Sequence, residues 1–197
     1  MKHNIEHLVA ACQQASKALA QLNNKKKNSI LFTIADQLEK NSGQIIAKNK
    51  IDMNNAEKND LSEAMQDRLL LDEARIEKMA RAVREIAELS DPVGMFSEYK
   101  QRPSGIKVAR MTISLGVIAM IYESRPNVTS DAAALCLKAG NAIVLRGGSE
   151  AFYSNQAIAE VIHKALEQQN LPKEIVTLIP TTDREAVNQL LQMNQYI

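Results

Sequence analysis

Glycine and proline are distributed very unevenly along this chain of 197 residues. The first 91 residues contain one glycine, Gly43, and no proline, whereas all five prolines and the remaining glycines follow from Pro92 onward. Because both residues are unfavourable inside helices, the first part is expected to be helical and the second part to contain turns and strands. The sequence therefore predicts a helical part at 1–91 and a differently built part at 92–197.

Apolar residues in the first part recur three and four positions apart, which is typical of helices that bury one face. Long stripes of this kind run over 5–22, 30–38 and 76–87, and a shorter one lies between the last two. Asp72 is a suitable N-cap for the helix at 76–87. Pro92 is expected to stop that helix, because proline disfavours helical geometry at the residue before it.

The second part changes to continuous apolar runs of strand length, which are expected in strands covered on both faces. Residues 106–114 are predicted to be extended and partly exposed, and Thr182 with Glu185 is predicted to form a capping box for the last helix. Alternating strands and helices indicate βαβ units, so the predicted fold class is α/β with a Rossmann-like parallel sheet. The predicted strands are 117–121, 142–145 and 175–179, and the helices between them are 130–139 and 150–169.

Charge and cysteine content exclude several classes of protein. Lysine and arginine total 24 and aspartate and glutamate total 23, so the net charge of +1 gives no electrostatic case for a nucleic-acid or anionic-membrane partner. No apolar run approaches the ~20 residues that span a bilayer. The two cysteines are too few for a disulfide framework and lack metal-ligand spacing, so we expect no metal site and a cytoplasmic location. Cys12 and Cys136 lie on predicted buried helix faces, which disfavour the thiolate, so both are predicted to be structural.

The loops after the predicted strands are the candidate binding site, because ligands of open α/β sheets bind at the carboxyl ends of the strands. None of these loops carries a G-x-G-x-x-G or Walker pattern. Arg146, Gly147 and Gly148 follow the second strand, where glycine allows close backbone approach and arginine offers donors to phosphate or ribose. The alternative is a plain turn in which Arg146 is solvated or paired with Glu150.

The loop after the first strand contains Pro126 and Asn127. The side-chain amide of Asn127 can donate a hydrogen bond to a developing oxyanion, and one such donor contributes ~3 kcal/mol to transition-state stabilisation. The alternative is an asparagine that caps the following helix. The spacing alone leaves both interpretations open.

The second part also carries a distinctive peptide, Tyr-Glu-Ser-Arg-Pro-Asn-Val-Thr, at 122–129. It lies within the first of three longer segments, which are 115–129, 131–141 and 145–150, and shorter matching segments are 67–72, 91–94, 102–105 and 181–184. Together these segments closely resemble the γ-glutamyl phosphate reductases of the aldehyde dehydrogenase superfamily. The resemblance covers essentially the whole chain, and it implies that 92–197 form part of an aldehyde dehydrogenase-type NADP-binding domain.

The resemblance implies a cytoplasmic enzyme of proline biosynthesis that uses NADPH to reduce L-glutamate 5-phosphate to L-glutamate 5-semialdehyde and releases phosphate. In that reaction a cysteine thiolate displaces phosphate to give a thioacyl enzyme, which is then reduced by hydride. Neither Cys12 nor Cys136 matches this nucleophile, so it is expected in a catalytic domain outside this chain, and the chain alone is expected to be inactive. The expected partners are the substrate, further copies of the full-length protein, and glutamate 5-kinase as a candidate.

Two residues match superfamily positions of known role. Asn127 matches the asparagine that helps hold the substrate carbonyl oxygen, and Arg146 matches a basic residue, usually lysine in relatives, on the adenosine side of the cofactor. The alternative from another class is a non-catalytic nucleotide-binding or subunit-pairing module, whose sheet would need a closed edge. The resemblance implies that Glu123, Ser124, Arg125 and Arg146 bind the cofactor. With Gly147, Gly148 and Ser149 of the loop after the second strand, these are the predicted cofactor-binding residues.

Overall fold

The computed structural model describes residues 5–197, and the first part of the chain is helical, as predicted. Its helices are α1 (Ile5–Leu19), α2 (Asn24–Lys40), α3 (Ser42–Lys58), α4 (Glu63–Leu69) and α5 (Glu73–Glu88). The carboxylate of Asp72 caps α5 by accepting the backbone N–H of Arg75 at 2.7 Å, which confirms the predicted cap. The short helix α4 was not predicted. None of the helices between residues 5 and 197 is long and apolar enough to cross a membrane.

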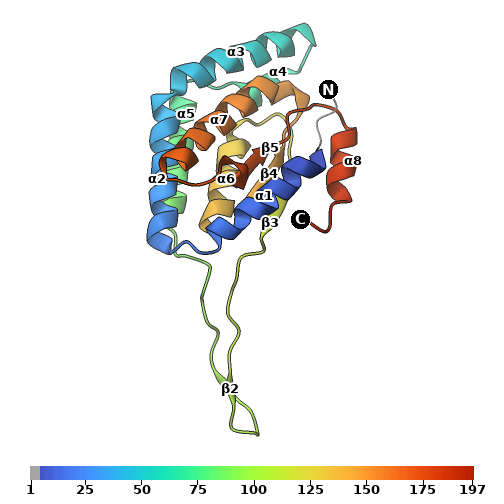
Figure 1. Ribbon diagram of the computed structural model, residues 1–197. Helices are drawn as coiled ribbons and strands as arrows, with labels where there is room; N and C mark the ends of the chain where they lie inside the picture. The colour runs from blue at the N-terminus through green and yellow to red at the C-terminus, as the bar shows by residue number, and fades with distance from the viewer. Residues whose placement is uncertain (1–4) are drawn as a thin grey trace.

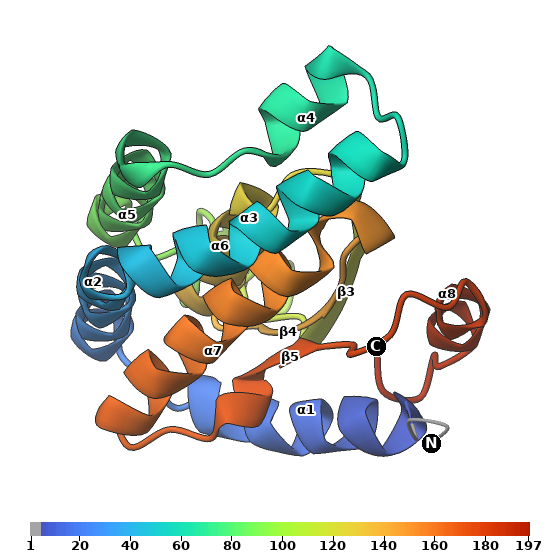
Figure 2. The ribbon, with the colours of Figure 1, turned by 90° about the horizontal axis from the view of Figure 1, so that it is seen from above.

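The second part forms a parallel sheet with helices between its strands. Its elements are β3 (Val117–Ile121), α6 (Asn127–Lys138), β4 (Ala142–Arg146), α7 (Phe152–Gln168), β5 (Val176–Leu178) and α8 (Glu185–Leu191). The strand order is β3-β4-β5, and both pairings are parallel, as the βαβ pattern predicted. Figure 2 shows α1 against one face of the sheet and α6 and α7 against the other, with α2, α3 and α5 outside them. One apolar core therefore includes residues from both parts of the sequence, and the domain boundary at 91/92 stays a prediction.

Two expectations for the second part are wrong. β4 is buried throughout, but β3 is not covered on both faces, since Met120 is 37% exposed and Ile121 is 43% exposed. The cause is position, because β3 pairs with β4 only and lies at the edge of the described sheet. The capping box at Thr182 does not form, since the backbone N–H of Glu185 donates to the carboxylate of Asp183 instead, at 2.9 Å.

Residues 92–115 leave the body of the protein as a long arm (Figure 1). Its two paired strands are β1 (Lys100–Gln101) and β2 (Lys107–Val108), which run antiparallel, and a further bridge joins Phe96 to Met111. The expectation of an extended, partly exposed chain after the turn is confirmed. The sequence did not indicate the segment with which this chain pairs.

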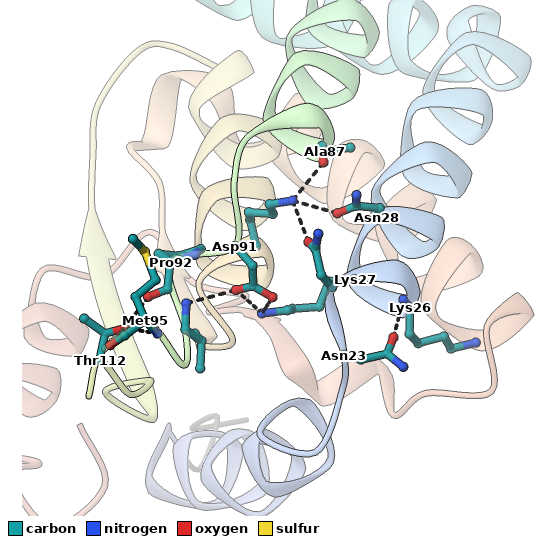
Figure 3. Close-up of polar contacts among 12 residues, drawn as sticks. Asn23, Lys26, Lys27, Asn28, Ala87, Asp91, Pro92, Met95 and Thr112 are labelled. Carbon is teal, nitrogen blue, oxygen red and sulfur yellow. Dashed lines mark hydrogen bonds and ion pairs between the residues drawn. The ribbon is translucent and has the colours of Figure 1, made fainter. Parts of the chain in front are cut away.

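A buried ion pair holds the base of the arm (Figure 3). Lys27 on α2 is 2% exposed, and its Nζ lies 2.7 Å from Oδ1 and 2.6 Å from Oδ2 of Asp91. The carboxylate of Asp91 also accepts the backbone N–H of Val93 at 3.0 Å, at the start of the arm. The ammonium group of Lys138, near this pair, donates to three neutral oxygens, those of Asn24, Asn28 and Ala87. The arm is therefore anchored where α2, α5 and α6 meet.

Candidate functional site

Strands β3 and β4 end side by side. The backbone N–H of Tyr122, just after β3, donates to the carbonyl of Arg146, the last residue of β4, at 3.1 Å. The loops that follow the two strands meet as well, because a Cβ atom placed on Gly148 would lie 3.4 Å from Cα of Glu123 and 3.5 Å from the backbone nitrogen of Ser124. The structure therefore brings together several of the expected cofactor-binding residues at the carboxyl ends of β3 and β4.

The side chain of Arg146 is buried and reaches the loop after β5. Its guanidinium donates to the carbonyl oxygens of Thr182 at 2.8 Å, Asp183 at 3.3 Å and Gly147 at 3.0 Å. Nε of Arg146 is also buried, and it has no hydrogen-bond partner in the described part of the chain. The alternative of a solvated arginine, or of one paired with Glu150, is therefore wrong. The guanidinium joins two strand-end loops, and its Nε–H is left as a buried donor without a partner in the described residues.

Gly147 allows the loop after β4 to pack closely against the protein itself. A Cβ atom there would overlap Nδ2 of Asn155, on α7, and would lie 3.2 Å from the ring of Tyr122. Both neighbours are fixed, because the hydroxyl of Thr129 lies 2.6 Å from the hydroxyl of Tyr122 and donates to Oδ1 of Asn155 at 3.0 Å. The close approach predicted from the glycines is present, but at Gly147 its partners are α7 and the residue after β3.

The other expected cofactor-binding residues differ in their surroundings. Ser124 is buried and has a φ of +29°, in the left-handed region that is uncommon for a residue with a side chain. Glu123 is exposed, and Ser149 is exposed with its hydroxyl 3.1 Å from a carboxylate oxygen of Glu150. Arg125 does not join this group and lines a separate cavity instead.

Asn127 is the first residue of α6, which begins here rather than at 130 as expected. Pro126 occupies the cap position, so the alternative of an N-cap asparagine is wrong. The Nδ2 group of Asn127 donates to Oδ2 of Asp131, one turn later, at 2.9 Å. Because this nitrogen carries two N–H groups, Asp131 engages one and the other is available for a second acceptor.

Asn127 faces a cavity of about 400 Å³ between α6 and the α4–α5 segment. The charged residues of its wall are Arg68, Arg75, Lys78, Arg125, Asp67 and Asp131. Burial raises the pKa of Asp131, and its Oδ1 is buried without a hydrogen-bond partner among residues 5–197. None of the α4 and α5 residues was expected at the site from the sequence. The three-residue spacing of Arg75 and Lys78, which places both on one helix face, was the available signal.

Neither cysteine is placed as a reactive thiol. Both are buried, and burial raises the pKa of Cys12 to about 12 and that of Cys136 to about 11. Such thiols are almost fully protonated at neutral pH. The predicted burial of both cysteines is confirmed, and their structural role stays a prediction. Within the part of the chain that the structure describes, no group of three or more His, Cys, Asp or Glu side chains is arranged to hold a metal ion.

Comparisons with known proteins agree with this architecture. The family model described as "Aldehyde dehydrogenase family" matches residues 1–196. The chain is 50% identical over 194 residues to the curated γ-glutamyl phosphate reductase of Salinibacter ruber, a match that covers 98% of this chain and 44% of that protein. The chain therefore spans about half the length of the curated relatives it matches.

Solved structures show the same relationship. The crystal structure of γ-glutamyl phosphate reductase from Thermotoga maritima matches with a TM-score of 0.94 and 35% identity, over 98% of this chain and 47% of that one. A probable aldehyde dehydrogenase from Listeria monocytogenes matches with a TM-score of 0.75 at 18% identity, over 96% of this chain and 39% of that one, and so shares the fold alone. The predicted α/β class with a Rossmann-like parallel sheet is confirmed.

Proposed function

Because the chain belongs to the aldehyde dehydrogenase family, we propose that it is the cofactor-binding part of an NADPH-dependent γ-glutamyl phosphate reductase. The whole enzyme converts L-glutamate 5-phosphate to L-glutamate 5-semialdehyde and phosphate in the cytoplasm, as a step of proline biosynthesis. The observation that carries the proposal is the pair of unused donors at adjacent strand ends, Nε of Arg146 and one amide N–H of Asn127. The donor of Arg146 is proposed to serve the cofactor, and the amide N–H of Asn127 is proposed to donate to the substrate carbonyl oxygen.

In the proposed reaction a cysteine thiolate attacks the acyl phosphate, the bond to phosphate breaks, and a thioester forms. NADPH supplies the hydride that reduces the thioester to the aldehyde, and the thiolate leaves. Both steps place negative charge on the carbonyl oxygen of the substrate. The free N–H of Asn127 stabilises that charge, and Asp131 holds the amide in the orientation that presents it to the cavity.

The nucleophilic cysteine of this proposal lies in a catalytic domain outside the chain, since the thiols of Cys12 and Cys136 are buried and protonated. We therefore expect the 197-residue chain to form no L-glutamate 5-semialdehyde from L-glutamate 5-phosphate and NADPH. Oxidation of NADPH, followed by its absorbance, measures this, and Cys136→Ser serves as the control variant. Turnover by the chain that is lost in Cys136→Ser would contradict the proposal and make Cys136 the nucleophile.

The loop after β4 fits the sugar and phosphate groups of a dinucleotide. Nε of Arg146 is a buried donor without a partner in the described residues, so the guanidinium keeps hydrogen-bonding capacity and positive charge next to this loop, which favours phosphate. Gly148 lies against the backbone of Ser124, so the loops after β3 and β4 are in contact and could both line one cofactor site. The residues proposed to hold NADPH are Glu123, Ser124, Arg146, Gly147, Gly148 and Ser149, whereas Arg125, which was also expected there, lines the cavity beside Asn127 instead.

Arg146→Gln is expected to weaken NADPH binding by the chain by about 10-fold, because it removes a charged donor. Fluorescence titration of NADPH measures the dissociation constant. Arg146→Lys keeps the positive charge and should recover most of the affinity. Arg184→Gln, at an exposed arginine of the neighbouring loop, is the matched control and should bind as the original chain does. If Arg146→Gln binds NADPH as tightly as Arg184→Gln, Arg146 only joins the two loops.

The proposal includes partners. An enzyme that phosphorylates the 5-carboxylate of L-glutamate must supply the substrate, which makes glutamate 5-kinase the candidate protein partner. Self-association of the full-length protein is supported by the arm, where Phe96 and Ile106 are each 62% exposed and Ile113 is 71% exposed. The alternative of a non-catalytic module gains no support, because β3 and β5 each pair with β4 only in the described sheet and leave its edges open.

A further inference from the structure

The cavity beside Asn127 carries charges that the proposed carbonyl chemistry does not use. Arg75 and Asp67 satisfy each other, since Nη2 of Arg75 lies 2.5 Å from Oδ1 of Asp67. Arg68 and Lys78 differ, because neither side chain has a hydrogen bond or ion pair with any residue in 5–197. Two cations of the cavity wall are therefore available to a ligand.

Asp131 is the complementary feature of the same wall. Its Oδ2 accepts the amide of Asn127 at 2.9 Å, while its Oδ1 is buried with no partner in the described chain. A buried carboxylate oxygen in this state is costly unless a donor reaches it. Burial raises the pKa of Asp131, and side-chain hydrogen bonds from Asn127 and Ser130 offset this only in part. A ligand ammonium group beside this carboxylate would favour its charged form.

We propose that this cavity binds the α-amino acid end of the substrate, with Asp131 accepting the α-ammonium group and Arg68 and Lys78 pairing with the α-carboxylate. The inference rests on the proposed function, which places the substrate carbonyl at Asn127. In L-glutamate 5-phosphate two methylene groups separate that carbonyl from the α-carbon. A cavity of about 400 Å³ is within the size range of small-ligand sites and accommodates both ends of so short a molecule.

The distribution of charge selects for an amino acid. An acyl phosphate without the ammonium group would bring only negative charge toward Asp131, whose carboxylate has no cationic partner in residues 5–197. Such a ligand is disfavoured by repulsion, whereas the α-ammonium group converts the same contact into an ion pair. Arg125, which lines the cavity beside Asn127, provides a further positive charge for the phosphate group of the substrate. The cavity thus matches both signs of charge on the substrate.

The test compares L-glutamate with glutarate, which differs only in lacking the ammonium group. Both are titrated into the 197-residue chain, and binding is followed by NMR shifts of the backbone amides of Asn127 and Asp131. We expect L-glutamate to bind about 10-fold more tightly than glutarate. Asp131→Asn, which keeps the side-chain shape, should abolish this preference. Lys78→Gln should weaken both probes, while Arg81→Gln, an exposed residue of the same helix outside the cavity wall, should leave them unchanged.

Equal affinity for the two probes overturns the inference, and so does the absence of a saturable shift with L-glutamate. If Asp131→Asn does not fold, an unweakened response of both probes in Lys78→Gln and Arg68→Gln overturns it instead. The outcome also separates this inference from the reductase proposal. If the chain binds NADPH but does not prefer L-glutamate, only the proposal of an amino acid site is wrong. If the chain prefers L-glutamate but does not bind NADPH, the amino acid site is supported and the reductase proposal is wrong.

Discussion

Replacing Asn127 by alanine is expected to lower the kcat of the proposed complete reductase by about 100- to 1,000-fold. The variant removes the amide N–H that Asp131 leaves free for the substrate carbonyl, so the charge that develops on the carbonyl oxygen loses its donor. NADPH affinity should remain nearly unchanged, because Asn127 lies at the cavity and Arg146 at the other strand-end loop. Steady-state kinetics and a separate NADPH titration measure the two quantities.

Asn188→Ala is the matched control for this substitution. Asn188 is exposed on α8, and its amide also donates to a carboxylate on its own helix, that of Glu185 at 3.2 Å, but it lies outside the cavity wall. We expect its kcat to equal that of the original enzyme. If Asn127→Ala also retains full kcat, then the amide of Asn127 only orders Asp131 at the start of α6, and the proposed oxyanion contact is wrong.

The regular elements were predictable because they follow from local pattern. Apolar runs indicated β4 and β5, and three- and four-residue spacing indicated α1, α2 and α5. The position of a strand within a sheet is not a local property, however. β3 has an apolar run like that of β4, yet Met120 and Ile121 are exposed because β3 is an edge strand of the described sheet. The pairing within the arm likewise depends on contacts between segments, which periodicity does not contain.

The candidate site was predictable in part for the same reason. Parallel strands end at one edge, so the rule for α/β sheets was enough to select Arg146 and Asn127 as candidates. Arg68 and Lys78 were missed because they come from α4 and α5, and they reach the cavity only through the packing of α5 against α6. The glycines predicted a close backbone approach at Gly147, but they did not predict which segment lies there. That segment is α7, which becomes a neighbour of Gly147 only in the tertiary structure.

Replacing Asp91 by alanine is expected to lower the free energy of unfolding of the chain by about 3 kcal/mol. The variant leaves the ammonium group of Lys27, which is 2% exposed, without its ion pair (Figure 3). A second ammonium group, that of Lys138, then repels it without compensation. The variant also removes the acceptor for the backbone N–H of Val93 at the base of the arm. The value is at the low end for buried ion pairs, because the side chain of Asp91 is 19% exposed. Urea unfolding of the two proteins measures the difference.

Adding Lys27→Met to Asp91→Ala should recover most of this loss, because no unpaired buried charge then remains at the position. The pH dependence gives an independent check. Burial opposes ionisation of Asp91, but the hydrogen bonds from Lys27 and Val93 outweigh it and hold the pKa of Asp91 below its ordinary value of 3.8. The stabilisation is therefore complete above about pH 4 and is lost as the pH falls through the lower folded-state pKa, so the stabilities of the original chain and Asp91→Ala should converge in acid. A difference that persists or grows there would mean that Asp91 stabilises the arm base by some means other than its charge.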